Sequence, residues 1–247
     1  MAAEDTRRSR TLLAHLDAHP RLLSYHAHSP RSVGLKLLRI LAEGNDIALV
    51  SDAGTPAVSD PGAGLVAEVR TAGYAVVPLP GPSAVTTALS AAGFPADQYI
   101  FLGFLPRKGP ARTRLLERTA REEWTSVFFE APGRVADLLT DLSAACGAER
   151  RAVVARELSK LHEELRSGTL AELAEALGAD PPRGECTIVV EGAAPGVAPE
   201  EPMRASSAAQ RLLAAGVSRR ETVALLSELF GVARNEAYKL VTELSEQ

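Results

Sequence analysis

The segment from Leu49 to Gly64 reads LVSDAGTPAVSDPGAG and decides the fold of this chain. It continues the apolar pair Ile47-Ala48, and an apolar pattern with helical spacing follows it. In α/β proteins a strand, a loop and a helix in this order place the loop at the carboxyl end of the sheet, where ligands bind. An ordinary turn is the alternative interpretation. Because the loop is longer and more polar than a turn requires, we predict that it binds a ligand.

Length and composition indicate a folded protein of one large or two small domains. Of the 247 residues, 46% are hydrophobic and 23% are charged, and the formal net charge is −4. This acidic balance gives no general attraction to nucleic acid, so an RNA partner has to be bound by a local basic patch. The sequence contains neither a leader-like segment nor a long apolar run. We therefore predict a cytoplasmic protein without a membrane span.

The cysteines and histidines do not follow a metal-binding pattern. Cys146 and Cys186 lie far apart in the sequence, and His26 and His28 have no third ligand nearby. We predict free, buried thiols in a reducing compartment and no metal site. The glycine patterns of dinucleotide-binding and P-loop proteins are also missing, which argues against those ligands.

Apolar runs alternate with helical patterns from Leu22 to Glu191, which indicates an α/β fold. Strands are predicted over residues 22–26, 47–50, 74–79, 99–104, 124–130, 151–157 and 184–191. Helices are predicted over 31–43, 84–92 and 170–177, after Thr6, around 65–69 and after Gly109. No strand is predicted before Glu4.

The loop SDAGTPAVSDPG, residues 51–62, resembles the signature loop of the bacterial ribosomal RNA small subunit methyltransferase I family. That family belongs to the S-adenosylmethionine-dependent enzymes of the tetrapyrrole-methylase type. Five further segments are similar to elements of the same family: AEDTRR at 3–8, LPGPSAV at 79–85, FLPRK at 104–108, FFEAPGR at 128–134 and ARELSK at 155–160.

The resemblance implies a two-lobed tetrapyrrole-methylase-like (class III S-adenosylmethionine methyltransferase) fold of the α/β class, with the cofactor held between the lobes. We place an N-terminal lobe at residues 1–79 and a C-terminal lobe at 83–192, with the Gly81-Pro82-Ser83 turn as the hinge. The Pro-rich segment 193–203 is interpreted as a linker, and 204–247 as a helical module with helices over 207–215, 219–230 and 235–245. This module is either an RNA-binding helix-turn-helix or a packing or dimerisation cap.

The implied reaction is transfer of a methyl group from S-adenosylmethionine to the 2′-hydroxyl of a cytidine in 16S ribosomal RNA. The small ribosomal subunit is then the partner, and we also expect a homodimer. By the same resemblance, the residues expected to contact the cofactor are Gly54, Thr55, Val58, Ser83, Ala84, Phe129 and Thr187.

A ribose hydroxyl is a poor nucleophile, so a proton acceptor should assist the reaction. Asp5, Asp52 and Glu130 are the candidates. Asp52 and Glu130 follow or end predicted strands, and the resemblance implies that the AEDTRR element, which contains Asp5, borders the active cleft. Lys160 is expected to steady the hydroxyl or a phosphate. The residues expected to bind RNA are Arg7, Arg107, Lys108 and Arg134. An ordinary solvated helix face remains the alternative for the basic residues near Arg7 and near Arg112.

Two other functions remain open at this stage. One is an enzyme of the same fold with a small acceptor such as a tetrapyrrole, and the other is a non-catalytic RNA- or ribosome-binding protein. Family members also open with a strand and a Pro-x-Gly-Asn loop before the element that resembles AEDTR. That strand is missing here, either through a start codon assigned too far downstream or through its loss, and we expect the former. The chain as it stands should therefore bind S-adenosylmethionine weakly or be poorly soluble.

Overall fold

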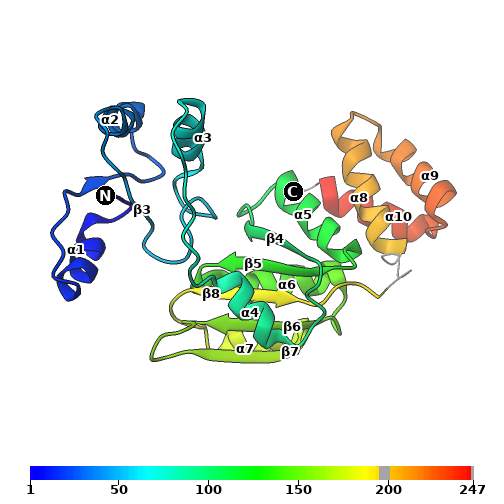
Figure 1. The fold of residues 1–247 in the computed structure, drawn as a ribbon. Helices are drawn as coiled ribbons and strands as arrows, with labels where there is room; N and C mark the ends of the chain where they lie inside the picture. The colour runs from blue at the N-terminus through cyan, green and yellow to red at the C-terminus, as the bar shows by residue number, and fades with distance from the viewer. Residues whose placement is uncertain (195–200, 246–247) are drawn as a thin grey trace. The chain divides into compact units, whose positions relative to one another are not determined.

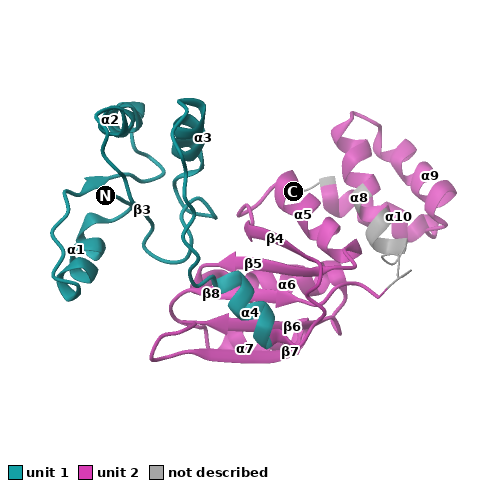
Figure 2. Ribbon diagram, in the orientation of Figure 1, with its two compact units in different colours: residues 1–91 teal, residues 92–247 magenta. Residues whose placement is uncertain are grey.

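The computed structural model describes residues 1–194 and 201–245 of the chain. Contacts between residues divide the chain into two compact units, Met1–Ala91 and Ala92–Gln247 (Figure 2). The elements of the first unit are β1 (Ala2–Ala3), α1 (Thr6–His15), β2 (Leu23–Ser24), α2 (Arg31–Ala42), β3 (Leu49–Val50) and α3 (Ala63–Thr71). Helix α4 (Ala84–Ala92) follows across the boundary (Figure 1).

The first unit is built on a small parallel sheet in the order β2-β1-β3. The central strand β1 is fully buried, and Ala2 pairs with Leu23 on one side and with Leu49 on the other. Ala2 forms a core with Leu37 of α2 and Leu65 of α3. The expectation that no strand precedes Glu4 is therefore wrong, because two small residues suffice to fill the gap between two neighbouring strands.

The strand predicted over residues 74–79 is also absent. This segment has no regular structure, and Val77 and Leu79 are 75% and 84% exposed. An apolar run forms a strand only where a neighbour pairs with its backbone, and no strand among the described residues does so here. Its apolar composition was therefore a misleading signal.

The second unit contains a five-stranded sheet in the order β4-β5-β8-β6-β7. Its strands are β4 (Tyr99–Phe104), β5 (Thr125–Glu130), β6 (Arg151–Arg156), β7 (Glu164–Thr169) and β8 (Cys186–Val190). Only β4 and β5 run parallel, and the remaining pairs are antiparallel. The register aligns Phe128, Ile188 and Val154 across three strands, and all three belong to one buried core.

Three helices of the second unit pack side by side and supply the rest of this core: α5 (Pro110–Arg121), α6 (Val135–Cys146) and α7 (Leu170–Ala179) (Figure 1). A short 3-10 helix, η1 (Pro132–Arg134), precedes α6. Helix α7 begins with a complete capping box in which Thr169 and Glu172 bond each other's backbone N–H groups. Cys146 and Cys186 are free thiols, as predicted, and burial raises the pKa of each to about 11.

The last three helices form their own small core. They are α8 (Glu201–Ala214), α9 (Arg219–Phe230) and α10 (Arg234–Ser245). The predicted bounds of α9 are confirmed, and the Ser218 hydroxyl caps this helix by accepting from the N–H of Glu221. The helix predicted over 207–215 extends back to Glu201, and most of the segment interpreted as a linker lies outside the described residues. No helix in the described part of the chain is long and apolar enough to cross a membrane.

Candidate functional site

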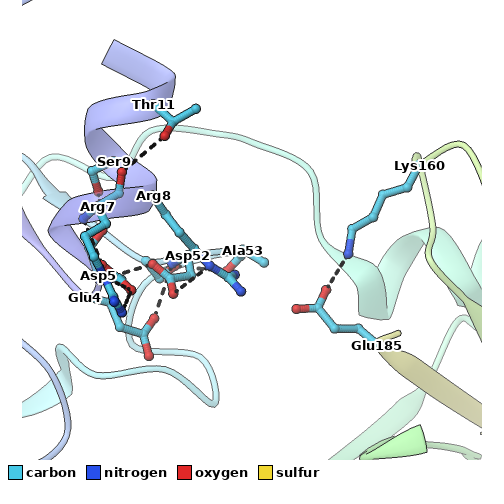
Figure 3. Close-up of polar contacts among 11 residues, drawn as sticks. Glu4, Asp5, Arg7, Arg8, Ser9, Thr11, Asp52, Ala53, Lys160 and Glu185 are labelled. Carbon is cyan, nitrogen blue, oxygen red and sulfur yellow. Dashed lines mark hydrogen bonds and ion pairs between the residues drawn. The ribbon is translucent and has the colours of Figure 1, made fainter. Parts of the chain in front are cut away.

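In the first unit, the carboxyl ends of β1 and β3 carry a network of charged side chains (Figure 3). The register pairs Ala3 with Val50, so the residues that follow each strand come together. The Asp5 N–H donates to Asp52 Oδ1 at 3.1 Å, and the Asp52 N–H donates to Glu4 Oε2 at 3.2 Å. The structure thus unites two of the predicted catalytic carboxylates, Asp5 and Asp52, in one network.

Both oxygens of Asp5 are occupied. Oδ1 accepts from the Arg7 backbone N–H at 2.8 Å and caps α1, while Oδ2 accepts from a terminal nitrogen of the Arg7 guanidinium at 2.7 Å. The hydrogen bonds from Arg7 lower the pKa of Asp5 to about 2. Such a carboxylate holds Arg7 in place and is a poor proton acceptor near neutral pH.

We expect the replacement Arg7→Ala to return the pKa of Asp5 toward its ordinary value of 3.8. The folded-state pKa is depressed, so the ion pair stabilises the fold above pH 3.8, and this contribution is lost as the pH falls through 2. NMR titration of the Asp5 carboxyl in the parent and the variant measures the shift directly. Arg10→Ala, which alters the same exposed helix, is the control and should leave the titration unchanged.

The loop that follows β3 has an unusual backbone. Ala57 and Ser59 adopt positive φ values of 71° and 61°, which are rare for residues other than glycine. At Gly62, φ is 143°, a conformation that favours glycine, and an added Cβ would lie 2.9 Å from the Leu49 side chain and 3.3 Å from the Ala57 backbone nitrogen. Among the predicted cofactor residues, Gly54, Thr55 and Val58 lie in this loop, and Val58 is 47% exposed. The strained, exposed backbone is typical of a ligand-binding loop.

Ser83 and Ala84 lie at the start of α4. The Ser83 carbonyl accepts from the Thr87 N–H at 2.9 Å, which makes Ser83 the residue before the first turn. The N–H groups of a first turn lack partners inside the helix and are free to bind polar groups of a ligand. This position fits the predicted contact with a cofactor.

In the second unit, Phe129 and Thr187 are cross-strand partners on β5 and β8. The Phe129 ring also packs against the rings of Phe101 and Phe104, at centroid distances of 4.8 and 5.7 Å. Because side chains alternate along a strand, Phe129 and Glu130 point to opposite faces of the sheet. The two cofactor residues of this unit therefore share one face, and Glu130 lies on the other.

Glu130 forms one wall of a pocket of about 260 Å³ that Arg107, Arg112, Arg134 and Asp137 also line. The Glu130 side chain is only 1% exposed, pairs with the Arg134 guanidinium and accepts from the Ala131 N–H at 2.8 Å. The structure thus brings together Arg107 and Arg134, two of the predicted RNA-binding residues. Arg107 and the neighbouring Lys108 are exposed. Guanidinium groups in such a pocket suit a phosphate.

Lys160 lies on the turn after β6 and has its own partners (Figure 3). Its Nζ donates to Glu157 Oε1 at 2.9 Å and to Glu185 Oε2 at 3.1 Å. The hydrogen bond to Glu157 raises the pKa of Lys160, so the amine remains a cation. The arrangement suits a fixed positive charge and not a proton acceptor.

Several partners of the charged residues in these sites were not predicted from the sequence. Arg112 is held by Asp141 through two bonds of 2.8 and 2.6 Å and by the Pro106 carbonyl at 2.9 Å. Asp141 lies on α6, whose buried residues Val135, Leu138, Leu139 and Leu142 follow helical spacing, so this helix could have been predicted. The described residues hold no group of three or more His, Cys, Asp or Glu side chains that suits a metal ion.

Comparisons with known proteins agree on one family. Residues 3–174 match the family model described as Tetrapyrrole (Corrin/Porphyrin) Methylases. Curated relatives include the Ribosomal RNA small subunit methyltransferase I of Pseudomonas aeruginosa, which is 43% identical and aligns over 97% of this chain and 86% of its own. The protein of the same name from Escherichia coli O157:H7 is 42% identical, over 98% of this chain and 85% of its own.

Solved structures share the fold at lower identity. The methyltransferase CobJ superposes with a TM-score of 0.55 at 19% identity, over 78% of this chain and 93% of its own. A Uroporphyrin-III C-methyl transferase from Thermus thermophilus, complexed with S-adenosyl homocysteine, superposes with a TM-score of 0.53 at 19% identity. The superposition covers 77% of this chain and 84% of that one. At this identity the likeness concerns the fold, and it confirms the predicted tetrapyrrole-methylase-like architecture.

Proposed function

Since this chain belongs to the ribosomal RNA small subunit methyltransferase I family, within the tetrapyrrole (corrin/porphyrin) methylases, we propose that it methylates 16S ribosomal RNA with S-adenosylmethionine as donor. The observation that carries the proposal is the identity of 43% over 97% of the chain with a relative of that name. The proposed acceptor is the 2′-hydroxyl of a cytidine. The proposed partner is the small ribosomal subunit and the proposed location the cytoplasm, while the homodimer stays a prediction.

For the cofactor, we propose contacts from two sets of residues. Gly54, Thr55, Val58, Ser83 and Ala84 form the set in the first unit, and Phe129 and Thr187 form the set in the second. Exposed loop backbone, hydroxyls and free helix N–H groups suit the amino-acid part of S-adenosylmethionine, and an aromatic ring suits its adenine. When bound, the cofactor supplies an electrophilic methyl group. These residues would hold it.

For the proton acceptor, contacts in the structure favour Asp52 over the other two carboxylates. Asp5 uses both oxygens on Arg7, and Glu130 is buried against Arg134 on the face opposite Phe129. Asp52 Oδ2, by contrast, has one ion pair, with Arg8 at 3.6 Å. We therefore propose that Asp52 accepts the proton of the ribose hydroxyl. Asp5 is proposed to position Arg7, and Glu130 to position Arg134, for contacts with RNA phosphates. Because its amine carries a positive charge, Lys160 is proposed to bind a phosphate.

Methyl transfer to unmodified small ribosomal subunits tests the proposal. With isotopically labelled S-adenosylmethionine, we expect label on the subunit RNA and a ribose methyl group in the mapped product. Loss of a general base costs about a hundredfold or more in rate, so Asp52→Asn should show a loss of that size. Asp46→Asn is the matched control, because Asp46 is exposed in the same unit and should retain full activity.

Other outcomes identify the alternatives. Methyl transfer to a tetrapyrrole in place of RNA would assign the chain to the small-molecule branch of the fold. Binding of subunits without methyl transfer to any acceptor would assign it a non-catalytic role. Full activity of Asp52→Asn would reject Asp52 as the proton acceptor and leave the family assignment intact.

A further inference from the structure

A second open pocket lies on the second unit, and no residue assigned above lines it. Its volume is about 320 Å³. It is bounded by the turn after β6, by the first residues of β7 and by the segment that leads into β8. The lining residues are Arg156, Glu157, His162, Arg166 and the run from Asp180 to Gly184.

The walls of this pocket are tied together by Glu157. Its backbone N–H donates to the Glu185 carbonyl at 3.1 Å, and its Oε1 accepts from the Glu185 N–H at 3.1 Å and from Lys160 Nζ at 2.9 Å. The backbone is strained at Glu157, where φ is 49°, while Gly184 adopts a φ of 79° that glycine accepts without strain. A Cβ on Gly184 would lie 2.2 Å from Glu157 Oε1, so the contact depends on glycine there. Strain held by hydrogen bonds of this kind is typical of functional sites.

Two guanidinium groups are fixed at the pocket by one carboxylate. Arg156 Nε donates to Glu164 Oε2 at 2.5 Å, and Arg166 Nε donates to Glu164 Oε1 at 2.6 Å. These hydrogen bonds, that of Arg166 above all, lower the pKa of Glu164 and keep it ionised. Arg166 also donates to Asp180 Oδ2 at 3.1 Å. Each guanidinium therefore keeps N–H donors that bond to none of the described residues.

The third guanidinium, that of Arg183, is exposed and makes no hydrogen bond or ion pair within residues 1–194 and 201–245. The carboxylates of the pocket, in contrast, are already engaged: Glu157 with Lys160, and Asp180 with Arg166. An incoming anion would thus meet unoccupied donors and paired acids. This chemistry suits a phosphate, which guanidinium groups bind through several N–H donors at once.

The pocket lies on the same edge and face of the sheet as the Arg107–Arg134 pocket. The register aligns Glu130 of β5, Cys186 of β8 and Arg156 of β6 in one row. Neighbouring strands lie about 4.8 Å apart, so the backbones of Glu130 and Arg156 are separated by about 10 Å. The two pockets therefore open at one edge and on one face of the sheet, where both can contact phosphates of one RNA strand.

We propose that this pocket, through Arg183, Arg156 and Arg166, binds a backbone phosphate of the substrate RNA in addition to the phosphate at the Arg107–Arg134 pocket. The inference rests on the proposed function and extends it by a second contact point. That contact reads no base sequence and sets the position of the RNA along the sheet edge.

The test is the salt dependence with which Arg183→Ala binds unmodified small subunits. Loss of one phosphate contact should weaken binding about three- to tenfold and lower the slope of log K against log salt by about 0.7 to 0.9. Arg183→Lys keeps the charge and should keep the parent slope. Arg121→Ala removes another exposed arginine, at the carboxyl end of α5, and should also behave like the parent.

The outcomes separate this inference from the proposed function. If the parent methylates subunits and Arg183→Ala has the parent slope, the second phosphate site is rejected and the enzyme assignment stands. If Arg183→Ala loses affinity for S-adenosylmethionine in place of RNA, the pocket belongs to the cofactor and the inference is also wrong. If the parent neither binds nor methylates subunits, the proposed function fails together with the inference.

Discussion

Replacing Arg134 with alanine is expected to lower the free energy of unfolding by about 3 kcal/mol, because the variant leaves a buried carboxylate without its partner. The Glu130 side chain is 1% exposed, and among the described residues it keeps the hydrogen bond from the Ala131 N–H once the guanidinium is removed. Urea unfolding measures the loss. The fluorescence of Trp124, the single tryptophan of the chain, reports on this unit since it immediately precedes β5.

The double variant Glu130→Gln/Arg134→Ala identifies the cause. A buried neutral amide costs less than a buried charge, so we expect the second change to restore part of the lost stability. Arg114→Ala, at an exposed position on α5, controls for the general effect of deleting an arginine. If the double variant is as unstable as Arg134→Ala alone, the guanidinium contributes by packing and the ion pair is not the cause.

Phe128→Ala is expected to have the largest effect on stability, a loss of about 4 kcal/mol. Phe128 is fully buried at the centre of the second unit's core, between Ile188 across the strand pair and the helices that cover this face. The substitution removes apolar contacts and leaves a cavity that a close-packed core fills only in part. The same urea experiment measures it.

Leu161→Ala is the matched control, because Leu161 belongs to the same unit but is 92% exposed. It should change the unfolding free energy by less than about 0.5 kcal/mol. An equally small change for Phe128→Ala would contradict the close packing of this core. A large loss for both variants would point to a contact of Leu161 that the exposed fraction does not reveal.

Local patterns predicted those elements whose formation depends on their own residues. The apolar run 99–104 became β4 with the same bounds, and the helix predicted over 219–230 became α9 with the same bounds. Strand β7 was missed because an edge strand buries only alternate residues, and its sequence ELRSGT lacks an apolar run. The segment 74–79 failed for the opposite reason, since it has the apolar residues but no partner.

The site was predictable to the same extent. Asp52 was placed by the strand predicted before it and Asp5 by the resemblance of its segment, and the structure brings the two into one network. The ion pairs were not predictable, because they depend on tertiary structure. Lys160 meets Glu185 from 25 residues away, and Arg112 meets Asp141 from 29. These partners decide which charged groups remain available to a ligand.

The two-residue strands of the first unit have a consequence for its dynamics. Strands β1, β2 and β3 each contribute two residues to their sheet, whereas those of the second unit contribute five or six. Few hydrogen bonds between strands protect such a sheet. The amide hydrogens of Ala2 and Ala3 should therefore exchange through opening events that cost far less free energy than global unfolding. The loop after β3 is then competent to bind only in the closed fraction of the ensemble. Ligand affinity at this loop is thereby coupled to the fraction of molecules in which the three-stranded sheet is formed.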